Sequence, residues 1–232
     1  MGTFVLVHGS WHGGWCWSRL TPVLRSGRHD VYAPSLTGLG DRSHLAGPEI
    51  GLTHHVEDVA SLLVYEDLHD VVLVGASYGG CVISGVAATI PERVRHMVFV
   101  DGLVPEAGQS CFDLMPGVRV GFVESSRAAG SEWAVPAPPP EFFGIVDPAD
   151  VEWARARLTA MPLRTHDEPL PTMAPSPSLP GTYVRCDQFV GFDAQMEPAR
   201  RRGYAIVHVD AGHDVQVTDA PSLAKLLLPL AL

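Results

Sequence analysis

The sequence lacks the features that mark several other classes of protein. Its four cysteines form no C-x-x-C pair and no metal-like spacing with histidine, so neither a disulfide framework nor a metal site is expected. No apolar run reaches the roughly 18 residues of a membrane-spanning helix. Residues 1–7 have neither the basic region nor the apolar length of a signal peptide. These absences predict a cytoplasmic protein without a membrane partner.

Positive charge is also scarce. The chain has 16 lysines and arginines against 26 acidic residues, which gives a net charge of −10. The only short basic cluster is Arg200–Arg202, so nucleic acid is not expected as a partner. The Gly-Lys-Ser/Thr sequence of phosphate-binding loops is missing as well. What the chain does have is 232 residues, 46% of them hydrophobic, enough for one large globular domain with an insertion.

One stretch organises the rest of the chain. Residues 71–80 read VVLVGASYGG, in which four apolar strand-forming residues end at Gly75 and Ser77 follows two residues later. A helix-like pattern begins just after Gly79. A G-x-S-x-G sequence between a buried strand and a helix is typical of a nucleophile elbow. The glycines allow the sharp turn that exposes the serine hydroxyl. We therefore predict that Ser77 is a catalytic nucleophile.

Apolar strands alternate with helical patterns along most of the sequence. This alternation predicts an α/β fold with a doubly wound, mostly parallel six-stranded sheet. The expected strands are Thr3–Val7, His29–Ala33, Val71–Val74, Val94–Val100, Gly181–Cys186 and Ile206–Val209. Such sheets bind their ligands beyond the carboxyl ends of the strands.

The alternation breaks between the fourth and fifth strands. Residues 102–180 are rich in proline and large apolar residues, and a structureless loop of that length is improbable in a compact domain. We predict that residues 1–101 and 181–232 form the core, and that 102–180 form a helical cap over the site, with a helix near Pro148–Thr159. The aromatic residues argue against a disordered linker. The predicted substrate pocket is lined by Trp11, Phe112, Trp133, Phe142 and Phe143.

A serine hydroxyl needs a base that accepts its proton. Among eleven histidines, His213 stands out because it follows the sixth strand on a glycine-containing loop and comes after Ser77 in the chain. The acid that orients the base is Asp101, after the fourth strand, or Asp187, after the fifth. We favour Asp101, because Phe189 stands two residues beyond Asp187, where the acid would be expected.

The reaction also needs two backbone N–H donors for the oxyanion. One is predicted to be Tyr78, directly after the nucleophile. The other is expected from the loop after the first strand, at Ser10, where neighbouring glycines let the backbone approach the substrate.

Several motifs carry a family resemblance. They are Phe4–Trp15, Pro34–Gly40, Gly75–Gly80, Val104–Ser110 and Gly212–Asp214. Together they resemble the α/β-hydrolase fold superfamily, and within it the branch of plant methylesterases, hydroxynitrile lyases and bacterial carboxylesterases. The resemblance covers nearly the whole chain and is weakest in the cap. It implies the same nucleophile, base and oxyanion donors, no cofactor, and a homodimer, which is common among such proteins.

Three positions depart from that branch. The lyases that this chain resembles have Thr where Gly9 stands and Lys where Asp214 stands, so ester hydrolysis is favoured over lyase activity. The family usually has its acid where Phe189 stands. Other α/β hydrolases, such as some lipases, carry the acid after the preceding strand, and Asp101 matches that arrangement.

We therefore expect a serine carboxylesterase that acts on a small to medium apolar or aryl ester through an acyl-enzyme. Its partner would be that small-molecule ester. Two alternatives stay open at this point: a ligand receptor of the same fold without turnover, and a cofactor-free lyase such as a hydroxynitrile lyase.

Overall fold

A six-stranded sheet lies at the centre of the molecule. The structure is a computed structural model that describes residues 2–171 and 179–231. The strand order is β2-β1-β3-β4-β7-β8, and every neighbouring pair is parallel. The strands are β1 (Thr3–Val7), β2 (Asp30–Tyr32), β3 (Val71–Ala76), β4 (Val94–Val100), β7 (Gly181–Cys186) and β8 (Ala205–Val209). The predicted parallel six-stranded α/β fold is confirmed.

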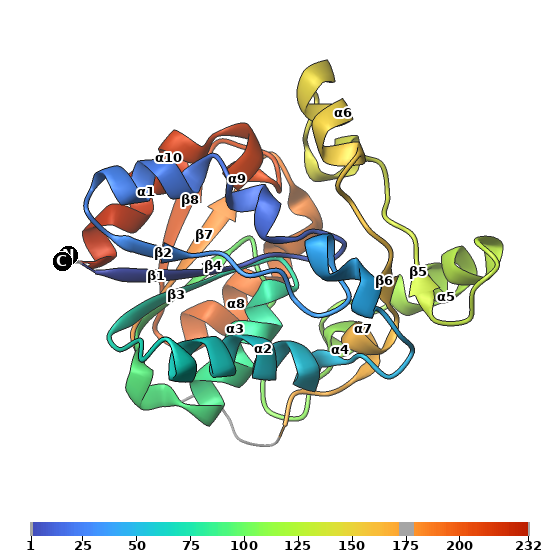
Figure 1. Cartoon of the computed structure of the whole chain (residues 1–232), viewed down its shortest axis with the longest axis horizontal. Helices are drawn as coiled ribbons and strands as arrows, with labels where there is room; N and C mark the ends of the chain where they lie inside the picture. Colours follow the sequence, from blue (N-terminus) through green and yellow to red (C-terminus); the bar gives the residue numbers. More distant parts are fainter. Residues whose placement is uncertain (1, 172–178, 232) are drawn as a thin grey trace.

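Helices cover both faces of this sheet (Figure 1). One layer contains α1 (Leu20–Ser26), α9 (Val215–Thr218) and α10 (Ala220–Leu227), and the other contains α2 (Leu52–Tyr65), α3 (Gly79–Thr89) and α8 (Met196–Arg201). Alternate strand residues face opposite layers, as the period of two of a strand requires: Phe4 and Leu6 pack with α1 and α10, whereas Val5 and Val7 pack with α2 and α3. This two-sided burial explains why β3 and residues 4–7 of β1 are apolar throughout.

The segment between β4 and β7 carries the cap elements. It contains α4 (Cys111–Leu114), α5 (Val118–Ala128), α6 (Pro148–Arg155) and α7 (Arg164–Asp167), with a small antiparallel pair of β5 (Ala134–Val135) and β6 (Met161–Pro162). Figure 1 shows α5 and α6 projecting from the rest of the molecule. Residues 172–178 of the predicted cap lie outside the described residues.

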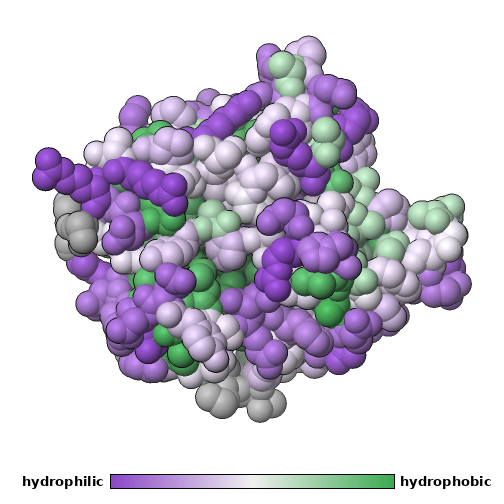
Figure 2. All heavy atoms as spheres, viewed as in Figure 1, coloured by the Kyte–Doolittle hydropathy of each residue, from purple (hydrophilic) through white to green (hydrophobic). Residues whose placement is uncertain are grey.

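Short 3-10 segments connect these elements: Gly14–Trp17, Gly40–Leu45, Pro91–Arg93, Pro140–Phe143, Val190–Gln195 and Leu228–Ala231. Figure 2 shows hydrophobic side chains surfacing in separate patches among hydrophilic ones. In the described ranges, none of the helices combines the length and apolar character needed to span a bilayer.

Candidate active site

Ser77 stands at a sharp turn between β3 and α3. Its φ angle is 53°, in the left-handed region that non-glycine residues seldom adopt. Its N–H donates to the carbonyl of Val100, 3.1 Å away. A Cβ at Gly75 would lie 2.5 Å from the carbonyl oxygen of Gly79, so the elbow needs glycine there. The strained turn presents the Ser77 side chain beyond the carboxyl edge of the sheet, as the sequence predicts.

His213 and Asp101 form a buried pair at the same edge. His213 Nδ1 lies 2.7 Å from Asp101 Oδ2, and the two side chains are almost fully buried. Because Nδ1 faces a carboxylate, it carries the ring proton, which leaves Nε2 as the acceptor. Ser77 and His213 line the same small cavity. The arrangement therefore offers a hydroxyl and an imidazole with a free acceptor nitrogen on one cavity, and a carboxylate behind the imidazole.

The other oxygen of Asp101 is held separately. Oδ1 lies 3.4 Å from Nη1 of Arg185 and 3.4 Å from the N–H of Cys186, and both groups donate to it. Arg185 also pairs with Asp193. The carboxylate is thus compensated by an arginine as well as by the imidazole, which keeps this buried charge satisfied.

The alternative acid, Asp187, lies elsewhere. Its carboxylate contacts His208 Nδ1 at 2.7 Å, and both side chains are exposed. The side chain of Phe189 instead packs on the catalytic imidazole candidate, with its ring centroid 4.5 Å from that of His213. Phe192 stacks on the same imidazole at 5.0 Å. An aromatic wall thus occupies the place where the resemblance would put an acid.

The two expected oxyanion donors, Ser10 and Tyr78, line one cavity together with Ser77 and His213. Gly9 lies against Ser77: a Cβ there would be 2.9 Å from the Cβ of Ser77. The loop after β1 can approach the elbow this closely only because Gly9 has no side chain.

This cavity, of about 370 Å³, is lined by Ser77 and by residues of the segment between β4 and β7. Three of the five predicted pocket residues line it: Trp11, Phe142 and Phe143. Sequence reasoning missed other lining residues, among them Leu103, Leu114, Met115, Phe122, His166, Phe189, Phe192 and Gln195. No Asp, Glu, Lys or Arg is among its described lining residues. The cavity suits a neutral apolar or aromatic group.

Phe112 and Trp133 are not among the described lining residues of this cavity. Phe112 is buried, and its ring contacts those of Phe122 and His166, which do line the cavity. The backbone of Trp133 lies beside the β5–β6 pair, since its carbonyl accepts from the N–H of Leu163, and its side chain is not part of the lining. Aromatic composition predicted an apolar wall but not which face of each cap element turns inward.

A second buried histidine–carboxylate pair lies beside the first. His12 Nε2 is 2.8 Å from Asp214 Oδ2, and His12 Nδ1 is 2.7 Å from the carbonyl of Ser10. Burial acts to lower the pKa of His12, but the Asp214 carboxylate outweighs it and holds that pKa above its ordinary value. Burial acts to raise the pKa of Asp214, and His12 holds it below its usual range. The pair is therefore an ion pair that ties the loop of Ser10 to that of His213.

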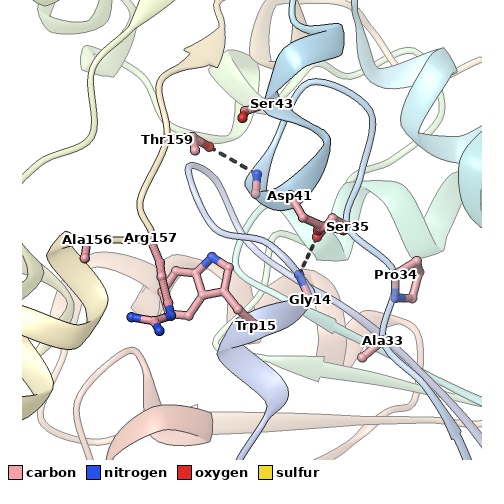
Figure 3. A pocket seen from close by; sticks show the side chains of 11 residues that line it. Gly14, Trp15, Ala33, Pro34, Ser35, Asp41, Ser43, Ala156, Arg157 and Thr159 are labelled. Carbon is pink, nitrogen blue, oxygen red and sulfur yellow. Dashed lines mark hydrogen bonds between the residues drawn. The ribbon is translucent and has the colours of Figure 1, made fainter.

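A larger surface hollow of about 730 Å³ is lined in part by Gly14 and Trp15, from the segment after β1 (Figure 3). Trp15, Ser35, Asp41, Arg157 and Thr159 are among its lining residues. Neither Ser77 nor His213 contributes to this hollow. It is therefore separate from the 370 Å³ cavity that Ser77 and His213 line, which we call the reaction cavity. In the described part of the chain, no cluster of His, Cys, Asp or Glu is arranged to hold a metal ion.

Comparisons with known proteins agree with this architecture. The model of the alpha/beta hydrolase family matches residues 4–225. A carbendazim hydrolyzing esterase from Nocardioides sp. (strain SG-4G) is 36% identical over 99% of this chain and 100% of that protein. Methylesterase 1 from Arabidopsis thaliana is 33% identical over 46% of this chain and 41% of its own length. The structure of an extracellular alpha/beta-hydrolase from a Paenibacillus species covers 100% of this chain and 99% of that one, with a TM-score of 0.88 and 24% identity.

Proposed function

This chain belongs to the alpha/beta hydrolase family and is a serine esterase, and we propose that it hydrolyses small to medium apolar or aryl esters through an acyl-enzyme on Ser77. The observation that carries the proposal is the 2.7 Å contact between buried His213 and Asp101, beside a serine on a strained elbow. The proposed roles are nucleophile for Ser77, base for His213 and orienting acid for Asp101.

In the first half of the reaction, Ser77 Oγ attacks the ester carbonyl carbon while its proton passes to His213 Nε2. Asp101 stabilises the imidazolium that forms. The backbone N–H groups of Ser10 and Tyr78 donate to the developing oxyanion. When the tetrahedral intermediate collapses, the alcohol leaves with the proton from His213. In the second half, water attacks the acyl-enzyme by the same route and releases the acid.

The proposed substrate is neutral because the cavity has an apolar, largely aromatic lining and an unpaired charge there would be costly. One relative that matches the full chain is named for hydrolysing carbendazim, so carbendazim belongs in the substrate panel. Phe142 and Phe143, from the cap, are proposed to select the shape of the substrate.

The test is a screen of p-nitrophenyl esters from acetate to octanoate, aryl and methyl esters, lactones, thioesters and carbendazim. We expect turnover of short neutral esters by the wild type, and none by Ser77→Ala or His213→Ala. Unchanged turnover in Ser77→Ala would refute the proposal. A fluorophosphonate probe should label only proteins that retain Ser77. No labelling of the wild type would favour the receptor alternative, and cyanide release from mandelonitrile would favour the lyase.

We also propose a cytoplasmic location, supported by the four cysteines, all of which are buried free thiols. A homodimer is proposed from the family resemblance alone. Fractionation of the source cells and light scattering of the purified protein test these two points.

A further inference from the structure

One histidine of the cap contacts both residues that are proposed to bind the oxyanion. His166 lies on α7, is 1% exposed and lines the reaction cavity. Its Nε2 is 3.0 Å from Ser10 Oγ. Its ring stacks on that of Tyr78, with the centroids 4.8 Å apart and the planes 16° from parallel. The cap thus reaches the two backbone donors through a single imidazole.

The proton arrangement around His166 follows from its neighbours. Thr165 Oγ1 donates to the carbonyl of Pro162 at 2.7 Å, so it is an acceptor toward His166 Nδ1, 2.9 Å away. With the proton on Nδ1, Nε2 is an acceptor, and Ser10 Oγ donates to it. Each polar hydrogen in the series Ser10, His166, Thr165 thus has one acceptor, and this fixes the orientation of the Ser10 side chain.

The other donor residue is held in a complementary way. The face of the Tyr78 ring is covered by His166, and its hydroxyl lies 2.9 Å from His55 Nδ1. His55 Nε2 lies 2.8 Å from the carbonyl of Thr37, to which it donates. His55 Nδ1 is therefore an acceptor, and Tyr78 donates to it. The ring face and the hydroxyl group of Tyr78 are therefore both held in place.

From these contacts we propose that His166 is a positioning residue, which holds the backbone N–H groups of Ser10 and Tyr78 at the oxyanion and makes their alignment depend on a seated cap. The inference rests on the proposed function. Burial lowers the pKa of His166 to about 3, so its imidazole stays a neutral acceptor at neutral pH. Since backbone donors act only when they are preorganised, loosening them affects the transition state more than the bound ester.

Two substitutions separate the two contacts. His166→Phe keeps a ring on Tyr78 but removes the acceptor for Ser10, and His166→Gln keeps a polar acceptor but removes the stacked ring. We expect His166→Phe to lower kcat by roughly 10- to 100-fold, up to the loss caused by removing a whole donor, with little change in KM. His166→Gln should retain more of kcat. Affinity for a boronic acid that forms a tetrahedral adduct on Ser77 should fall in parallel with kcat.

A double-mutant cycle isolates the hydrogen bond. Ser10→Ala removes the same bond from the other side, so His166→Phe should cost little further kcat in that background. Phe112→Leu is the packing control: Phe112 contacts the His166 ring and is not among the described residues that line the cavity, so kcat and boronic acid affinity should be kept even if the melting temperature falls.

Failure of the two proposals can be told apart. If the wild type hydrolyses no ester, the proposed function fails. If the wild type is active and folded His166→Phe keeps wild-type kcat and boronic acid affinity, the positioning role is refuted. If His166→Phe does not fold, Ser10→Ala decides, and an unchanged kcat there also refutes it.

Discussion

Three buried neutral histidines should make the protein sensitive to mild acid. Burial lowers the pKa of His8 and of His166 to about 3 and that of His55 to about 4. Geometry agrees, because a ring nitrogen in each is already an acceptor: His8 Nε2 accepts from the N–H of Leu36 at 3.0 Å, and His55 Nδ1 accepts from Tyr78. A proton added to that ring nitrogen would point at a hydrogen-bond donor and would have no acceptor. Folding therefore keeps these rings neutral.

The sign of the effect follows from linkage. In the unfolded chain a histidine has a pKa near ~6.5 and binds a proton below it, whereas these three folded rings do not. Their contribution to stability is complete above pH 6.5 and is lost as the pH falls. From pH 7 to pH 5, each histidine lowers the free energy of unfolding by about 2 kcal/mol. Three such histidines together lower it by about 6 kcal/mol. His12, whose pKa is raised, acts in the opposite direction and offsets part of that loss.

That loss is comparable with the whole stability of many domains, about 5–15 kcal/mol. Equilibrium urea unfolding at pH 7 and pH 5, followed by tryptophan fluorescence, measures it. His55→Gln should reduce the difference between the two pH values by about 2 kcal/mol. Replacement of exposed His44 by Gln is the matched control and should leave the difference unchanged. Equal stability at both pH values, or the same loss in His55→Gln as in the wild type, would refute the reasoning.

Three further predictions concern the site. Asp101→Asn should lower kcat on p-nitrophenyl butyrate by about 10⁴-fold, because the amide carries no charge to stabilise the imidazolium and its N–H can hold the ring in the wrong tautomer. Asp187→Asn should stay near wild type, and the reverse ranking would assign the acid to Asp187. Gly9→Ala places a methyl group 2.9 Å from the Cβ of Ser77, so kcat should fall by about 10²-fold while the circular dichroism spectrum is unchanged. Full activity would show that the loop after β1 moves to accommodate the methyl group. Asp214→Asn leaves the buried imidazole of His12 without its counter-ion and should destabilise the fold by about 3 kcal/mol in urea unfolding, whereas Asp187→Asn, from an exposed pair, should cost less than about 1 kcal/mol. Similar losses of unfolding free energy in these two variants would contradict a stabilising ion pair between His12 and Asp214.

Much of the site could be predicted because its parts are local. The elbow around Ser77 needs only a strand, two glycines and a helix in order, and each has its own pattern in the sequence. The His213 loop follows a strand directly, and parallel strands bring their carboxyl ends to one edge. The boundaries were less predictable: the cap helix that was expected near Pro148–Thr159 ends at Arg155.

The cap shows where sequence reasoning stops. Its aromatic content predicted an apolar cap. However, Phe112 is buried outside the cavity lining, whereas Phe122 is part of that lining. Short helices of four to eleven residues, such as α4 and α5, give too few turns for periodicity to define an inward face. Phe189 and Phe192 lie on the imidazole of His213, a contact for which the sequence carries no local signal.

The sequence by itself determined the elbow, the order of Ser77 and His213 along the chain, and the parallel sheet, since these depend on backbone conformation and on alternation along the chain. Tertiary structure decided which groups touch. It placed Asp101, rather than Asp187, 2.7 Å from His213, because β4 lies between β3 and β7 in the sheet. It also brought His12 to Asp214 and His166 to Ser10 across 202 and 156 positions of sequence. Such pairs depend on strand order and on how the cap packs, and no spacing in the sequence encodes either.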